Sequence, residues 1–159
     1  MQTMDAFDSG EESMMSPDDA SMPLGRRLAR IREILDDLLD KGEVGDGWQA
    51  LSTEEHELEQ MIIDRNLKGV ALEEQGDKEG AIQLYEQNVA DEVDTPHPYG
   101  RLAAIYREEE LVDDEIRVLK RAIALFGDID PWRERLATVR KATGRGRGSD
   151  RQDAIWDRL

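Results

Sequence analysis

The chain has 159 residues and a formal net charge of −16, with 38% hydrophobic and 36% charged residues. It contains no cysteine, which excludes disulfides and thiolate metal sites, and no apolar run approaches the about 20 residues that a membrane-spanning helix needs. So acidic a chain repels nucleic-acid phosphates, so we expect that it does not bind nucleic acid. It also lacks a basic segment followed by an apolar one, the pattern of a secretory signal, so we expect a cytoplasmic protein.

An acidic segment opens the sequence. Residues 1–22 contain Met, Ser, Asp, Glu and Gly without lasting periodicity, so we expect a disordered acidic leader. Apolar residues then recur at steps of three or four and predict a first helix over residues 24–41, which Gly42 ends. The members of this stripe are Leu28, Ile31, Leu35 and Leu38. Residues 43–47 are rich in acids and glycines and predict a loop.

A second, longer helix is predicted over residues 53–75. Ser52 and Glu55 have the spacing of a capping box, in which a hydroxyl and a carboxylate each satisfy a free backbone N–H at a helix start. Trp48 and Leu51 precede this start. We expect them to pack the preceding loop against the helices as a plug.

Two further helices follow in close succession. Gly76 is placed to end the second helix in a left-handed conformation, and Asp77 to cap a third helix over residues 78–91. Thr95 and the proline after it have the pattern of an N-cap and a first helical residue. They predict a fourth helix over residues 96–109.

The last helices complete an all-α pattern. A fifth helix is predicted over residues 113–126, with Gly127 as its stop, and a sixth over residues 130–142 that starts with an Asp-Pro pair. Residues 144–159 predict a flexible basic tail with a short helix near its end.

Two stretches of the chain repeat at a spacing of 34 residues. A period of this length predicts stacked helix-turn-helix units, each of which buries its apolar face against the next. The matched pairs are Gly69 and Ala103, Leu72 and Tyr106, Ile82 and Ile116, Tyr85 and Leu119, and Val89 and Ile123. A third, partial copy continues the series at Leu136 and Ala137.

These positions resemble the tetratricopeptide repeat, whose unit is two antiparallel helices. In the first unit, residues 62–95, the family's small positions hold Gly69 and Ala81, its turn holds Gly76 and its aromatic position holds Tyr85. In the second unit, residues 96–129, Ala103, Tyr106 and Ala122 fit. The chain departs from the pattern at Lys68, Asn88 and Glu115, and Gly76 becomes Glu110 in the second unit.

The resemblance implies an all-α fold of antiparallel helical hairpins, stacked as a short right-handed solenoid. It covers about two and a half repeats over residues 62–142, within a single helical-repeat domain over residues 23–143. Because about three repeats are needed for stability, we expect the helix at residues 24–41 to pack on the first repeat and complete the core.

A concave groove lined by the first helix of each unit is also implied by the resemblance. Arg101 and Arg135 are 34 residues apart, as are Arg107 and Lys141, so we expect four bases to line this groove, together with Asn66 and His97. Arginine forks suit carboxylates, which predicts an acidic peptide or a chain-terminal carboxylate as the partner. The alternative is that each base pairs with a neighbouring acid.

No catalytic arrangement stands out in the sequence. The two histidines, His56 and His97, are not placed to form a metal site, and no nucleophile lies beside a base, so we expect neither an enzyme nor a cofactor. The sequence predicts a non-enzymatic adaptor or scaffold that binds another protein or peptide. An acidic inhibitor that mimics nucleic acid, and a structural subunit of a larger assembly, remain as alternatives.

Overall fold

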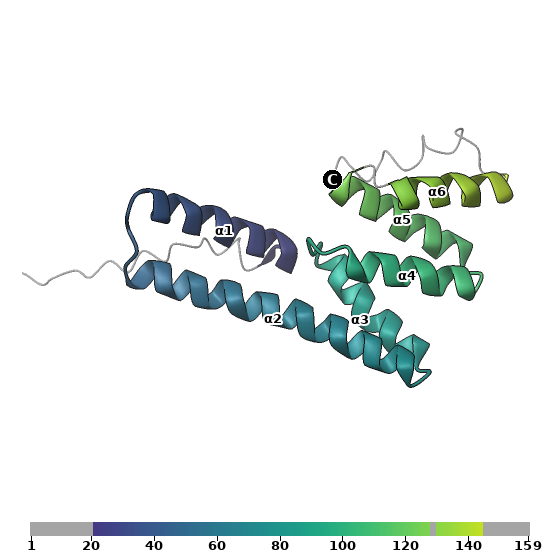
Figure 1. Ribbon diagram of the computed structural model, residues 1–159, viewed down its shortest axis with the longest axis horizontal. Helices are drawn as coiled ribbons and strands as arrows, with labels where there is room; N and C mark the ends of the chain where they lie inside the picture. Colours follow the sequence, from purple (N-terminus) through teal and green to yellow (C-terminus); the bar gives the residue numbers. More distant parts are fainter. Residues whose placement is uncertain (1–20, 128–129, 145–159) are drawn as a thin grey trace, which may run out of the picture.

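The computed structural model describes residues 21–127 and 130–144, and within them every regular element is an α-helix. Figure 1 shows six helices packed in chain order. They are α1 (Leu24–Asp40), α2 (Asp46–Glu74), α3 (Lys78–Ala90), α4 (His97–Glu108), α5 (Val112–Phe126) and α6 (Asp130–Ala142). The predicted disordered leader, most of the basic tail and its short helix lie outside the described residues.

The helices pack mainly against their neighbours in sequence. The principal contacts join α1 to α2, α2 to α3, α3 to α4, α4 to α5, and α5 to α6. In Figure 1, α1 lies along the N-terminal half of the long α2 helix, and α3 lies against its C-terminal half. One core therefore runs through the six helices, and its fully enclosed members include Ile31, Ala81, Tyr85, Tyr99, Leu102, Val118 and Leu119.

The first helix also reaches beyond its neighbour. The backbone N–H of Gly25 donates to the carbonyl oxygen of Asp91 over 2.7 Å, where α3 gives way to the α3–α4 turn. The guanidinium groups of Arg26, on α1, and Arg121, on α5, both pair with the carboxylate of Glu92 in this turn. The turn thus ties α1 to the later helices, in agreement with the expectation that the first helix completes the core.

Two of the five residue pairs that are 34 positions apart are buried alike, and the other three pairs each combine a buried with a half-buried residue. Gly69 lies so close to the Tyr85 ring that a Cβ atom there would be 2.6 Å from ring atom Cε1, which explains the need for a small residue. Ala103, the residue 34 positions later, is also buried. Tyr85 and its counterpart Leu119 are both enclosed, at 0% and 1% exposure. Ala137, the third residue of the small series, is exposed, since no described helix follows α6.

The turns that end α2 and α4 share a backbone conformation although their residues differ. Gly76 has a φ of 81° and Glu110, 34 positions later, has a φ of 57°. Both lie in the left-handed region, which glycine adopts freely and other residues adopt at a cost. The predicted departure at Glu110 therefore changes the residue and leaves the turn unchanged.

The predicted start of the second helix is wrong. Helix α2 begins at Asp46, with Gly45 before it, so Ser52 lies inside the helix and caps nothing at its start. Trp48 and Leu51 accordingly belong to the first turns of α2, where Leu51 is buried and Trp48 is half-buried against the core. They pack as expected, but from a helix rather than a loop.

The remaining helix ends follow the predictions closely. The Asp77 carboxylate accepts a hydrogen bond from the Gly80 N–H at 2.9 Å and caps α3 as predicted. Helix α4 starts one residue later than expected: Pro96 occupies the N-cap position, and no Thr95 side-chain cap forms. Of the helices described, none is both long enough and apolar enough to cross a membrane.

Candidate functional site

The candidate site lies on the side where the C-terminal half of α2 adjoins α4. Arg101, in the second turn of α4, reaches Glu73 near the end of α2, with its Nε 3.0 Å from the carboxylate Oε1 and its second nitrogen on the other oxygen. The His97 ring meets the Tyr85 ring edge-on, with centroids 5.8 Å apart. These contacts bring the two helices together around Tyr85, the aromatic residue of α3.

Helix α2 also carries exposed aliphatic side chains one to three turns before Glu73. Ile63 and Leu67 are 43% and 63% exposed. An α-helix turns by about 100° per residue. Viewed along the axis of α2, the side chains of Val70, Ile63 and Leu67 are therefore rotated from that of Glu73 by about 60°, 80° and 120°, all in the same direction. Because Glu73 faces α4, Val70 and Ile63 lie toward the α4 side of α2, and Leu67 extends this apolar strip further round the exposed side of the helix. We call Ile63, Leu67, His97, Arg101 and Arg107 the α2–α4 face.

Glu73, Arg101 and Tyr85 form a hydrogen-bonded group where α2 meets α4. The hydrogen bond from Arg101 holds the pKa of Glu73 below its ordinary value of 4.5, assisted by a second bond from the Tyr85 hydroxyl at 2.7 Å. Burial, followed by the hydrogen bond to Glu73, raises the pKa of Tyr85. The Glu73 carboxylate is therefore ionised and accepts hydrogen bonds from Arg101 and from the neutral Tyr85 phenol. These bonds orient the Arg101 side chain toward α2.

Arg135, the second predicted groove base, is held by another helix. Its Nε and its Nη2 donate to the two oxygens of Glu115 on α5, at 2.6 and 3.0 Å. Glu115 is 2% exposed, and its hydrogen bond raises the pKa of Arg135. Arg101 and Arg135 therefore both follow the alternative reading, in which a base pairs with an acid, although their acids lie on different helices.

Asn66 is engaged in the helix interface as well. Its side-chain oxygen accepts a hydrogen bond from Asn88 at 2.9 Å, and Asn88 is fully buried between α2 and α3. Arg65 also donates to the Asn88 side-chain oxygen, at 3.2 Å. The polar residue that departs from the repeat pattern thus has its hydrogen bonds satisfied, and Asn66 helps to satisfy them.

Arg107 and Lys141 differ from the other two bases. Both are exposed, and within residues 21–127 and 130–144 neither side chain makes an ion pair or hydrogen bond. They lie in the last turns of α4 and α6, where positive charge also complements the helix dipole. Of the four predicted bases, Arg107 and Lys141 are therefore the two that are unpaired within the described part of the chain.

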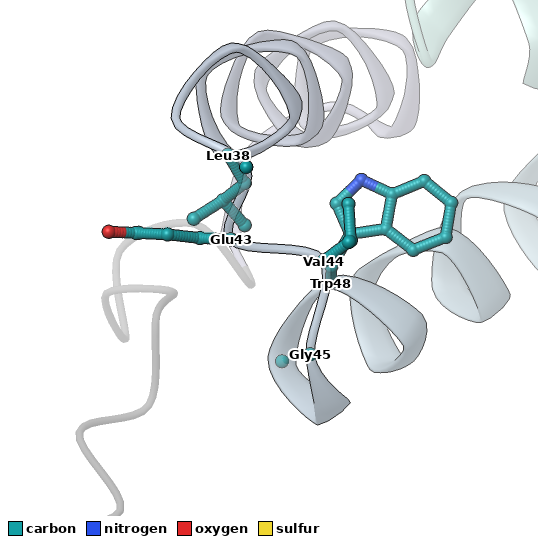
Figure 2. Close-up of a pocket in the computed structure, with 7 residues that line it drawn as sticks. Leu38, Glu43, Val44, Gly45 and Trp48 are labelled. Atoms are coloured by element: carbon teal, nitrogen blue, oxygen red, sulfur yellow. The ribbon is translucent and has the colours of Figure 1, made fainter.

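A hollow of about 550 Å³ lies at the turn between α1 and α2. Figure 2 shows Leu38 and Trp48 on either side of it, with Val44 and Gly45 on the connecting loop. The indole N–H of Trp48 is buried and has no hydrogen-bond partner within the described ranges. The hollow is shallow, and its one charged lining residue is Glu43.

Comparisons with protein-family models, with curated proteins and with solved structures find no match for this chain. The described residues contain no group of three or more His, Asp or Glu side chains that could hold a metal ion.

Sequence reasoning missed two features of this site. Ile63 and Leu67 were not singled out from the sequence, and the structure leaves both exposed. Their angular offset from Ile62 and Gly69, which are buried, was the signal that could have separated them. Glu73 gave no signal in the sequence, and Glu115 was visible only as a departure from the repeat pattern, because the pairing of both acids with arginines depends on helix packing.

Proposed function

We propose that the protein is a non-enzymatic interaction module that binds a segment of another protein along the α2–α4 face and its continuation on α6. The observation that supports this most directly is the exposed pair Ile63 and Leu67, one helical turn apart, beside a helix that carries the unpaired Arg107. Two exposed aliphatic side chains in register suit the apolar anchors of a bound segment. An unpaired arginine suits one of its carboxylates.

The tetratricopeptide-like arrangement is part of the same proposal. It is supported by the close approach of Gly69 to Tyr85 and by the burial of Ala81, Ala103 and Ala122. In such an array α2, α4 and α6 would be the first helices of successive units. A short right-handed solenoid would place them side by side on its concave surface.

Selection of peptides on the intact chain tests the proposal. A displayed library of random 12-residue peptides is panned against the wild-type protein, and the bound peptides are titrated against a double variant, Ile63→Glu with Leu67→Glu. We expect at least a tenfold loss of affinity, because the anchors would meet two carboxylates. The matched control is Leu39→Glu with Val44→Glu, which alters the exposed aliphatic residues at the α1–α2 turn. Equal affinity for both double variants would exclude the α2–α4 face as the binding site.

An acidic decoy that occupies a basic partner is the second candidate. Asp36 and Asp40 lie one turn apart on the exposed side of α1, and neither makes an ion pair within the described ranges. Binding through this surface would be lost in a variant with Asp36→Asn and Asp40→Asn and retained in the Ile63 and Leu67 variant. The same titrations therefore distinguish the two functions.

A further inference from the structure

The start of the described fold lies beside one end of the α2–α4 face. Gly25, in the first turn of α1, is hydrogen-bonded to Asp91, and Arg26 pairs with Glu92, five residues before α4 begins at His97. Figure 1 shows the first turn of α1 next to the start of α4. Residues 1–20 therefore join the described fold close to the end of the face that His97 occupies.

The chemistry of residues 1–20 complements this face. They contain six acids and no lysine or arginine. They also contain apolar side chains, which are Met1, Met4, Phe7, Met14 and Met15. Methionine adapts its shape to irregular apolar surfaces and is common at binding surfaces that accept several partners. The face offers the counterparts, an aliphatic strip and an unpaired arginine.

We propose that residues 1–20 bind to the α2–α4 face of their own chain, with methionine side chains on Ile63 and Leu67 and carboxylates toward Arg107. This inference rests on the proposed function, because it assigns an internal occupant to the same face. An external segment then binds only by displacing residues 1–20. A partner must therefore bind the face more tightly than residues 1–20 do.

Length and tethering both permit this contact. Twenty extended residues span up to about 66 Å, whereas the 12 residues of α4 span about 18 Å. A covalent tether of this length gives an effective concentration of the order of millimolar. Contacts too weak to hold a free peptide therefore suffice to hold the attached segment.

The hollow at the α1–α2 turn is the competing location for the same residues. It also presents exposed aliphatic side chains, Leu39 and Val44. It lies at the far end of α1, whose 17 residues span about 25 Å, and its charged lining residue is Glu43. The lining thus offers no cation to the acids of residues 1–20, whereas the α2–α4 face offers Arg107, which favours that face.

Paramagnetic labelling of the full chain tests the proposal. Because the sequence has no cysteine, Met15→Cys provides a single attachment site for a nitroxide. We expect the methyl signals of Ile63 and Leu67 to lose more than half of their intensity, and those of Leu39 and Val44 to keep theirs. The loss should be unchanged on tenfold dilution, and Arg107→Glu should reduce it, whereas Lys41→Glu at the far end of α1 should not.

Three outcomes would overturn the inference. They are undiminished signals at Ile63 and Leu67, a loss at Leu39 and Val44 instead, or a loss that disappears on dilution and so reports a second copy. A further readout separates this inference from the proposed function. Replacing Asp5, Asp8, Glu11 and Glu12 by their amides should strengthen the binding of a panned peptide about fivefold. Peptide binding without this gain defeats the internal occupant alone, and absence of any peptide binding defeats the proposed function.

Discussion

Gly25 and Asp91 are joined by a backbone hydrogen bond of 2.7 Å, across a separation in sequence that spans the whole of α2 and α3. The contact is so close that a Cβ atom on Gly25 would lie 2.1 Å from the carbonyl oxygen of Glu92. Glu92 itself has a φ of 53°, in the left-handed region. The backbone of the α3–α4 turn is therefore shaped to meet α1, and α1 belongs to the same structural unit as the later helices.

Substitution of Gly25 should break this junction. Gly25→Ala forces the backbone of α1 away from the turn, and we expect the free energy of unfolding to fall by about 3 kcal/mol, in the range of severe overpacking. Urea titration followed by circular dichroism measures the change.

Gly100→Ala is the matched control for that substitution. Gly100 lies within α4, and a Cβ atom there would meet nothing within 4 Å. Alanine should raise the free energy of unfolding by about 0.5–1 kcal/mol, because glycine is the poorer helix former. Similar effects of the two substitutions would mean that α1 does not dock on the turn.

Helix ends were predictable from sequence where one residue dictates the backbone. Gly42, Gly76 and Gly127 all adopt a positive φ at or near the end of a helix, as their positions after apolar stripes indicated. The start of α2 was not predictable in this way. Ser52 and Glu55 match a capping box, but the same pair fits inside a helix, and Asp46 offered an earlier acidic start.

The candidate site was predictable only in part for a related reason. The spacing of 34 residues singled out Arg101 and Arg135 as a pair of positions in sequence. It carries no information on which acid each base meets, because Glu73 precedes Arg101 on α2 whereas Glu115 reaches Arg135 from α5. Pairing between helices is decided by their packing, which the spacing of residues along the chain does not reveal.

The shared conformation of Gly76 and Glu110 leads to opposite effects of substitution. Gly76→Ala places a side chain at a φ of 81° and should cost about 1 kcal/mol. Glu110→Gly removes a side chain from a φ of 57° and should stabilise the protein by about 0.5–1 kcal/mol. This figure is the backbone strain that is relieved, minus the cost of the greater freedom that glycine has in the unfolded chain. Thermal unfolding of both variants gives the signs. A loss of stability in each would show that the two turns are not equivalent.

The Glu73–Arg101 pair should make stability depend on pH in the acidic range. The pKa of Glu73 is lower in the folded protein than its ordinary value of 4.5, so the pair stabilises the fold above pH 4.5. This contribution is lost as the pH falls through the lowered pKa. Glu73→Gln should therefore cost about 1 kcal/mol at pH 7 and less at pH 3, measured by urea unfolding.

Glu74→Gln is the control for this pH dependence. Glu74 is exposed, one residue further along α2, and makes no ion pair within the described ranges. Its amide variant should follow the wild type at both pH values. A cost of Glu73→Gln that does not shrink on acidification would show that the pair contributes through packing alone.

Arg135 and Glu115 should respond unequally to the loss of their partners. Arg135→Gln leaves a carboxylate that is 2% exposed without its guanidinium, and we expect a loss of about 3 kcal/mol. Glu115→Gln leaves Arg135 a neutral acceptor and access to water, so the loss should be about 1 kcal/mol. The double variant should be more stable than Arg135→Gln alone, because no buried charge remains.

The double-mutant cycle, measured by urea unfolding, isolates the coupling between the two side chains. Lys141→Gln is the control, since Lys141 is exposed and unpaired within the described residues, and it should change stability by no more than about 0.5 kcal/mol. Additive effects of the two single substitutions would contradict the pairing. In that case Arg135 would be free to face a ligand together with Arg107, and the basic lining predicted from the repeat spacing would regain one of its members.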